Sequence, residues 1–240
     1  MSRRFFDDQP FTAQQAVALG AGPSHHIGKV LRMAPGEAVT LFNGEGGEWS
    51  AVLEEVGKKA VVARPLEFTD IDRAGPLPVT LGLPLIKGDR MDYALQKATE
   101  LGVAAIRVLD TERTEVRLKG ERAAKKAEHW RQVVISACEQ CGLNRPPPVD
   151  GPLPLETFLA EARGLALIAH PGEAPLAASA LRDAEAVTLL TGPEGGFSDP
   201  ELEAARDAGF LPFALGERVL RAETAPVALL ASLWAVRALA

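Results

Sequence analysis

The sequence is poor in cysteine and aromatic residues, and it has no long uninterrupted apolar run. Only two of its 240 residues are cysteines, Cys138 and Cys141, which excludes a disulfide framework of the secreted type. No apolar stretch reaches the roughly 18–20 residues that a bilayer-spanning helix needs, and residues 1–8 lack the apolar segment of a signal peptide. We therefore expect no membrane segment and a place in the reducing cytoplasm.

The charge balance disfavours a protein that coats nucleic acid non-specifically. The chain carries 26 Lys+Arg against 32 Asp+Glu, a net charge of −6, while 47% hydrophobic residues exclude a disordered chain. Residues 107–145 form a basic segment with 9 basic and 6 acidic side chains, whereas residues 146–240 hold 6 and 13. The basic segment is either a surface that faces phosphates or an ordinary solvated helix face.

A polar stretch, Thr69–Pro76, ends in a Gly-Pro breaker and predicts a boundary between domains 1–75 and 76–240. Before it, a glycine-rich hairpin signal at 44–47 joins two of three β-type runs and predicts a small β-rich barrel. These runs are Ala38–Asn43, Trp49–Glu54 and Ala60–Leu66.

After the boundary, short apolar runs alternate with helical patterns. This alternation predicts an α/β domain with a parallel sheet flanked by crossover helices. The expected strands are Val79–Ile86, Ala105–Leu109, Gly164–Ala169, Val187–Thr191 and Leu211–Leu215. The expected helices lie near 89–101, 119–141, 153–162, 199–208 and 223–239.

The most informative stretch is Leu189–Glu201, in which a buried strand runs into a glycine-rich turn and then a helix. Ser198 and Glu201 have the spacing of a capping box. Gly192, Gly195 and Gly196 permit a positive φ and a close approach of the backbone, and a side chain at Gly195 is expected to strain the turn and obstruct a bound ligand. The glycine spacing fits neither a dinucleotide fingerprint nor a P-loop, and Glu194 disfavours a polyphosphate ligand. Taken alone, the stretch is either a ligand loop or a plain strand-to-helix turn.

A second loop, Leu215–Pro226, follows the next strand at the same sheet edge. Together, G-P-E-G-G-F-S-x-x-E and L-G-x-R-[IV]-L-R-x-E-T-A resemble the ribosomal RNA small-subunit methyltransferase E family of the SPOUT superfamily. Further matching segments are Arg3–Phe6, His26 with Val30–Arg32, Lys97–Val103, Thr111–Thr114, and Glu139-Gln140 with Asn144-Arg145. The chain departs from the family at Cys141–Arg145, where one basic residue of the family pattern is lost.

The resemblance implies a PUA-like RNA-binding β-barrel at 1–75 and a trefoil-knotted SPOUT methyltransferase domain at 76–240. It implies a homodimer that methylates N3 of a uridine in 16S ribosomal RNA with S-adenosylmethionine. The alternative is a non-catalytic RNA-binding ribosome-assembly factor. The residues implied to bind the donor are His170, Pro171, Thr191, Gly192, Pro193, Glu194, Gly195, Gly196, Leu215, Gly216, Arg218, Val219, Leu220, Thr224 and Ala225.

The chemistry needs a cation beside the uracil anion, and the catalytic candidates are Arg113, Arg145 and Arg221, with Arg218 also considered. The candidate proton acceptors are Glu194, Glu223 and Glu100, of which Glu100 has Lys97 as an alternative ion-pair partner. The candidate RNA contacts are Arg3, Arg4, Arg32, Lys97, Arg113, Lys125, Asn144 and Arg145. The alternative for these basic residues is an internal pair with Glu112, Glu121 or Glu139.

Other features favour structural roles. Cys138 and Cys141 have C-x-x-C spacing but no second ligand pair, so no metal is expected. His25 and His26 are expected to cap a helix or pack at the barrel edge, with RNA contact as the alternative. The apolar stretch Ala225–Ala240 is expected to be a core or dimer-interface helix, in which Leu229, Leu230, Leu233 and Trp234 form a surface covered by a second protomer.

Overall fold

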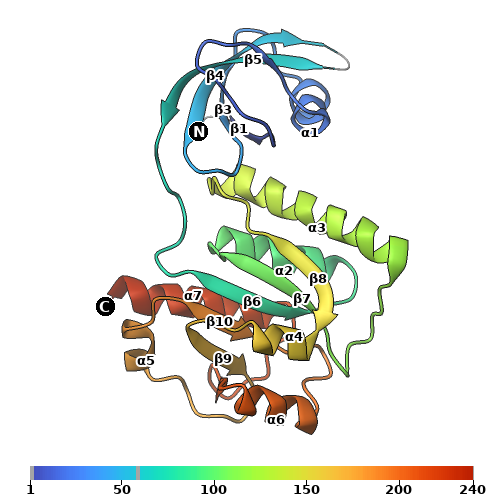
Figure 1. The fold of residues 1–240 in the computed structure, drawn as a ribbon, viewed down its shortest axis with the longest axis vertical. Coiled ribbons are helices and arrows are strands. Elements are labelled where there is room, and N and C mark those ends of the chain that lie inside the picture. The colour runs from blue at the N-terminus through green and yellow to red at the C-terminus, as the bar shows by residue number, and fades with distance from the viewer. Residues whose placement is uncertain (1–2, 58–59, 240) are drawn as a thin grey trace. The chain divides into compact units, whose positions relative to one another are not determined.

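The computed structural model describes residues 3–57 and 60–239, and the chain divides into two compact units (Figure 1). The first unit contains the residues up to Ala74 together with Ile135–Pro146, and the second contains Gly75–Val134 and the chain from Pro147 onward. The segment Ile135–Pro146 therefore belongs to the first unit, although it lies inside the range expected for the second domain. Its side chains explain this, because Glu139 accepts the Phe6 N–H at 3.0 Å and Asn144 donates to the backbone oxygen of Ile71.

The first unit is built on a five-stranded sheet with strand order β1-β3-β4-β5-β2. β1 pairs parallel to β3, and the other pairings are antiparallel. The strands are β1 (Arg3–Phe6), β2 (Val17–Ala18), β3 (Ala38–Phe42), β4 (Glu48–Val56) and β5 (Val61–Thr69). A short α-helix, α1 (Ala21–His25), continues into the π-helical segment η1 (His26–Val30).

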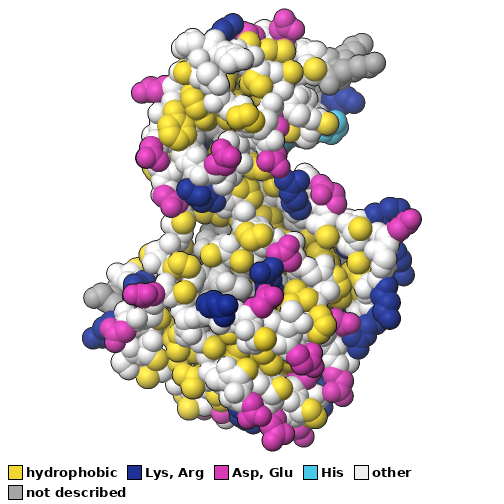
Figure 2. Space-filling view, in the orientation of Figure 1, with side chains coloured by type: hydrophobic (Ala, Val, Ile, Leu, Met, Phe, Trp, Pro, Cys, Tyr) yellow, Lys and Arg dark blue, Asp and Glu magenta, His cyan; other side chains and the backbone are white. Residues whose placement is uncertain are grey.

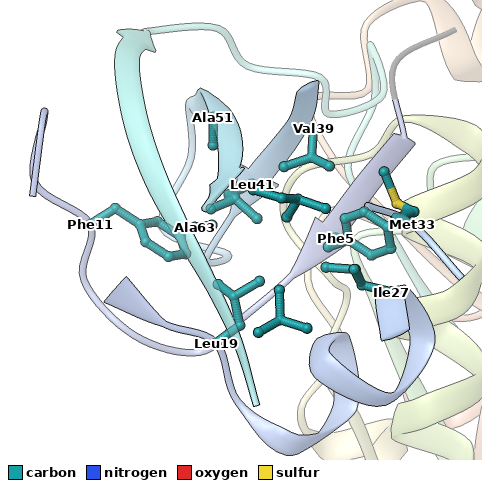
Figure 3. Close-up of a cluster of buried hydrophobic side chains, with 11 residues drawn as sticks. Phe5, Phe11, Leu19, Ile27, Met33, Val39, Leu41, Ala51 and Ala63 are labelled. Carbon is teal, nitrogen blue, oxygen red and sulfur yellow. The ribbon is translucent and has the colours of Figure 1, made fainter. Parts of the chain in front are cut away.

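The core of the first unit follows the two-residue period of its strands. In β3, Val39 and Leu41 are buried, and Figure 3 shows them among side chains from other strands and from the helical segment. Phe5 of β1 and Ile27 of η1 complete this cluster at 1% and 0% exposure. The alternation explains why β3, β4 and β5 were recognisable from their apolar pattern, whereas β1 and β2, with four and two residues, were not predicted.

An ion-pair network stabilises one edge of this unit. The Glu48 carboxylate accepts Arg4 Nη1 at 2.7 Å, and it accepts Arg73 Nε and Nη2 at 2.9 and 2.7 Å. The Arg73 hydrogen bonds lower the pKa of Glu48 to about 2, with help from Arg4 and against the opposing effect of burial. A carboxyl group whose pKa falls on folding stabilises the folded state above its unfolded pKa.

We predict that Glu48→Gln lowers the free energy of unfolding at pH 7. The loss should shrink as the pH falls from 4.5, the unfolded value, toward about 2, because wild-type Glu48 becomes protonated across that window. Urea unfolding followed by tryptophan fluorescence measures both proteins at each pH, with Glu55→Gln on the exposed side of the same strand as the control. A difference that stays constant over this pH range would contradict the role given to the network.

The second unit is built on a six-stranded sheet with strand order β11-β9-β10-β6-β7-β8. All of its recorded pairings are parallel. The strands are β6 (Val79–Pro84), β7 (Ala105–Asp110), β8 (Val149–Pro154), β9 (Leu165–Ala169), β10 (Val187–Leu190) and β11 (Leu211–Phe213). The helices are α2 (Asp89–Glu100), α3 (Gly120–Cys141, shared with the first unit), α4 (Leu155–Ala160), α5 (Ala178–Arg182), α6 (Asp199–Asp207) and α7 (Thr224–Leu239).

Both faces of the parallel sheet are covered. All four residues of β10 are buried, which requires cover on each side of the strand. α7 packs against α2 and α5, while α4 packs against α6. Within the described residues, no helix is long and apolar enough to span a bilayer.

The prediction that four apolar residues of α7 form a surface for a second protomer is wrong for its three leucines. Leu229, Leu230 and Leu233 are only 3%, 0% and 3% exposed, because the core of their own unit covers them. The ring of Trp234 lies against Gly75 and Gly102, where an added Cβ would approach it within 2.8 Å. The helix is therefore a core helix, and these leucines give no support for a dimer interface.

Candidate active site

A pocket of about 480 Å³ lies in the second unit, where several of its strands end. Because β6, β7, β9, β10 and β11 are parallel, their carboxyl ends meet at one edge of the sheet, which is the usual ligand edge of such sheets. The lining residues are Arg90, Arg113, Ala169, His170, Pro171, Gly192, Pro193, Glu194, Gly196, Phe197, Phe213, Ala214, Leu215, Arg218, Val219, Leu220, Arg221, Ala222, Glu223, Ala225 and Leu229. The volume lies within the range of about 300–1,000 Å³ that is typical of small-molecule sites.

The loop after β10 is held at its far end by the start of α6. The predicted capping box is present, and the Ser198 N–H donates to Glu201 Oε2 at 2.9 Å. The other oxygen of Glu201 accepts the Glu112 N–H at 2.8 Å, which ties this helix to the loop after β7. The capping box therefore fixes two of the loops that form the pocket.

Of the three loop glycines expected to permit a positive φ, only Gly196 has one, so the expected strain at Gly195 is wrong. The left-handed φ of +68° belongs to Gly196, which lines the pocket. Gly195 is not a lining residue, and a Cβ added to it would meet Arg113 Cβ at 3.0 Å rather than the cavity. Gly195 is therefore needed for the close approach of Arg113 to the loop.

Four arginines and two glutamates line the pocket. Arg113 donates from Nη1 to the Gly195 carbonyl oxygen at 3.2 Å, and Arg90 faces Glu194 with 3.6 Å between Nη1 and Oε1. Glu223 makes no hydrogen bond or ion pair with any residue that the structure describes. The pocket therefore combines apolar walls with a surplus of positive charge.

Two buried polar atoms of the lining have no hydrogen-bond partner among the described residues. They are Nδ1 of His170, which lies 4.0 Å from the nearest Glu173 oxygen, and Oε2 of Glu223. An unpaired buried polar atom is costly and calls for an explanation, and a ligand supplies one. These atoms, the apolar walls and the volume fit a small ligand with both polar and apolar parts.

Two family models match the chain. Residues 24–66 match the RNA methyltransferase PUA domain, and residues 73–234 match the RNA methyltransferase domain. The ribosomal RNA small subunit methyltransferase E of Synechocystis is 34% identical, covering 92% of this chain and 73% of the relative. That of Mycobacterium bovis is also 34% identical, covering 92% of this chain and 86% of the relative. This chain belongs to the ribosomal RNA small subunit methyltransferase E family.

Solved structures agree with this membership. The methyltransferase E of Neisseria gonorrhoeae, bound to S-adenosylmethionine, has a TM-score of 0.91 and 36% identity, with 98% of each chain covered. A protein of Legionella pneumophila, also in complex with S-adenosylmethionine, has a TM-score of 0.93 and 40% identity at the same coverage. The family resemblance is confirmed, and so is the fold class of a parallel α/β sheet with an N-terminal PUA domain.

Most residues that the family resemblance implied for donor binding line the pocket, and four do not. The four are Thr191, Gly195, Gly216 and Thr224. Thr191 is fully buried, and its hydroxyl donates to the Gly82 carbonyl oxygen at 3.3 Å, so its side chain stabilises the sheet. Sequence reasoning missed Arg90, which lies in the first turn of α2, the helix that follows β6.

Of the basic residues that the family resemblance suggested as RNA contacts, some form ion pairs within the chain and others are exposed. Arg3 pairs with Glu37, Arg4 with Glu48, and Lys97 with Glu100, so the alternative partner weighed for Glu100 is confirmed. In the first unit, exposed Arg32 has a left-handed φ of +51°, and the guanidinium of exposed Arg145 lies against Gly46. Arg32, Arg113, Lys125 and Arg145 make no recorded pair with Glu112, Glu121 or Glu139 within the described residues.

Asn144 is a correction to the expected RNA contacts. Its side chain is 0% exposed, and its amide donates to Gly47 O and Ile71 O at 3.2 and 2.7 Å. Its oxygen accepts the Arg73 N–H at 3.3 Å. Asn144 therefore joins backbone segments within the first unit and has no group left for RNA.

We predict that Asn144→Ala destabilises the protein by about 2–4 kcal/mol, because it leaves three backbone groups without their partner. Denaturant unfolding measures the loss. The control is Asn43→Ala, the chain's other asparagine, whose amide group hydrogen-bonds to Glu45 alone among the described residues. Equal stability of the Asn144 and Asn43 variants would contradict the structural role.

The basic segment forms an exposed surface near the start of α3. Figure 2 shows Lys and Arg side chains gathered over that end of the helix and over the segment before it. Lys119, Arg122, Lys125 and Lys126 are exposed there, whereas Arg117 pairs with Asp110. The surface has the charge that phosphate contacts require.

Cys138 and His26 pack within the protein. Cys138 is buried, which raises the pKa of its thiol, and Cys141 is exposed. His26 lies edge-on to Phe5, and its Nδ1 is 3.4 Å from Glu139. Among the residues that the structure describes, no group of three or more His, Cys, Asp or Glu side chains has an arrangement that could hold a metal.

Proposed function

We propose that this chain transfers a methyl group from S-adenosylmethionine to N3 of a uridine in the 16S ribosomal RNA of the small subunit. One observation carries the proposal: a pocket with two unpaired buried polar atoms lies at the ligand edge of the sheet, in a member of a family whose solved structures bind this donor. The donor-binding part rests on that pocket, and the choice of base rests on the family resemblance.

The pocket suits the donor in size and chemistry. Phe197, Leu215 and Val219 offer apolar surface for an adenine ring, and the backbone at Gly192 and Gly196 is free of side chains that would block its edge. When bound, S-adenosylmethionine supplies a methyl group on a positively charged sulfur. The protein's task is therefore to orient the two reactants and to stabilise the charge that develops on the base.

The arginines of the lining suit that electrostatic task. Uracil must lose the N3 proton, and a guanidinium near its oxygens favours the resulting anion. Arg113 and Arg221 line the pocket, and Arg218 lies beside them in the same loop as Arg221. Glu194 already faces Arg90, so it is a weaker candidate proton acceptor than its place in the glycine-rich loop suggested.

RNA binding is assigned to exposed cations without a recorded partner. We assign it to Arg32 and Arg145 in the first unit, and to Lys125 with its neighbours on α3 in the second. The chain's net charge is −6, so recognition should depend on the shape of a folded target as well as on charge. A substrate in the small ribosomal subunit places the reaction in the cytoplasm.

The homodimer and the trefoil knot stay predictions from the family resemblance. Exposed apolar side chains at the pocket support a dimer, since Leu215 and Val219 line the pocket and are 43% and 78% exposed. Light scattering at micromolar concentration should give twice the 25.5 kDa chain mass. A monomer mass with full activity would reject the dimer.

Two measurements test the proposal. Calorimetric titration with S-adenosylhomocysteine should show one site per chain, and tritiated donor should label 16S ribosomal RNA in small subunits. If the protein neither binds the ligand nor labels the RNA, the non-catalytic assembly factor is favoured. Binding without label on any ribosomal RNA would contradict the proposed substrate.

A further inference from the structure

The two glutamates of the pocket lining differ in their partners. Glu194 faces Arg90 at 3.6 Å, whereas Glu223 has no hydrogen bond or ion pair with a described residue. Its Oε2 is also shielded from solvent. Glu223 is therefore the one lining carboxylate whose charge is not already paired within the described chain.

An unpaired buried carboxylate oxygen is expensive, because its hydration is lost without a replacement hydrogen bond. Glu223 directly precedes α7, and the partial positive charge at a helix N-terminus favours a negative group there. That field lets the free protein keep the anion, but it supplies no hydrogen-bond donor to Oε2. The missing partner is best supplied by a ligand that enters the pocket.

The ligand group that fits Glu223 is a cation. Arg90, Arg113, Arg218 and Arg221 give the lining a surplus of positive charge, which opposes a positively charged ligand. The methionine end of S-adenosylmethionine carries two positive charges, on the sulfonium and on the ammonium group, and one negative charge on its carboxylate. We propose that the Glu223 carboxylate is the anionic contact that holds this cationic end, an inference that rests on the proposed function.

This assignment differs from the role of proton acceptor. The N3–H of uracil lies in the plane of the ring, and the new bond to carbon forms along the same direction. A carboxylate hydrogen-bonded to that proton would stand where the methyl group must arrive. A contact to the donor lets Glu223 remain in place throughout the reaction.

The test compares three ligands by calorimetry on wild type, Glu223→Gln and Glu223→Asp. S-adenosylmethionine carries both cations, S-adenosylhomocysteine only the ammonium, and 5′-methylthioadenosine neither. Glu223→Gln should weaken S-adenosylmethionine by about tenfold to a hundredfold, the usual worth of a hydrogen bond to a charged group, and leave 5′-methylthioadenosine unchanged. Glu223→Asp should recover part of the affinity.

S-adenosylhomocysteine identifies which cation is bound. If it weakens as much as S-adenosylmethionine, the contact is to the ammonium, and if it does not weaken, the contact is to the sulfonium. The matched control is Glu217→Gln, an exposed glutamate in the same loop that does not line the pocket. That control should bind all three ligands like wild type.

A structural role predicts different results. If Glu223→Gln weakens all three ligands equally, or lowers the thermal midpoint of the ligand-free protein well below that of Glu217→Gln, the carboxylate shapes the loop and the proposal is overturned. Unchanged affinity for all three ligands overturns it as well. Failure of wild type to bind any of them would refute the proposed function instead, so the two failures are distinguishable.

Discussion

Replacing Arg113 with alanine should reduce kcat/KM for methyl transfer to 16S ribosomal RNA by about 100- to 1,000-fold, the usual cost of removing one preorganised charge-stabilising donor. Arg113 lines the pocket, and its Nη1 donates to the carbonyl oxygen of Gly195 at 3.2 Å. The guanidinium is thereby fixed at the wall of the pocket, and the proposed function has it stabilise the uracil anion. Affinity for S-adenosylhomocysteine should change by less than about threefold, because the adenosine walls are untouched.

Two variants control this experiment. Arg117→Ala removes a nearby arginine that pairs with Asp110 and does not line the pocket, so it should keep nearly full activity. Arg113→Lys keeps the positive charge but loses the planar guanidinium, so its kcat/KM should lie between those of wild type and Arg113→Ala. Full activity of Arg113→Ala, or equal loss in Arg117→Ala, would remove Arg113 from the reaction.

Gly196→Val should weaken S-adenosylhomocysteine by about tenfold or more. Gly196 has a φ of +68°, a conformation that costs a β-branched residue roughly 1–2 kcal/mol, and it lines the pocket. A Cβ added at Gly196 meets no atom within 4 Å, so the valine side chain would pack against no other residue and would project from the pocket wall. The loop should therefore lose both its shape and part of its free volume.

Gly209→Val is the matched control for strain. Gly209 has a φ of +84° after α6, its Cβ position is equally open, and it does not line the pocket. Calorimetry and thermal unfolding should show similar destabilisation of the two variants but loss of affinity only at Gly196. Equal affinity in both would place the donor elsewhere.

Most helices and strands could be predicted from the pattern of apolar residues in the sequence. In the second unit, buried strands such as β10 read as continuous apolar runs, and helices such as α2 read as periodic ones. β8 was missed because its sequence, V-D-G-P-L-P, has the composition of a turn. α1 and α5, with five residues each, are too short to show a helical period.

The site could be found from sequence only where a loop had its own signature. The loops after β10 and β11 carry glycine and family motifs, and both line the pocket. Arg90 was missed because a charged residue in a first helical turn looks like ordinary surface until the sheet brings strand ends together. Asn144 was misassigned because its motif does not reveal that its amide bonds backbone segments of the first unit.

The central claim is methyl transfer to N3 of a uridine, and one measurement tests it most directly. Small subunits reconstituted with unmodified 16S ribosomal RNA are incubated with the protein and S-adenosylmethionine, and the RNA is digested to nucleosides for mass spectrometry. The account predicts N3-methyluridine at up to one residue per 16S molecule, and none without the donor. A methyl group on another base or on ribose, or no methylated nucleoside while the protein binds the donor, would contradict it.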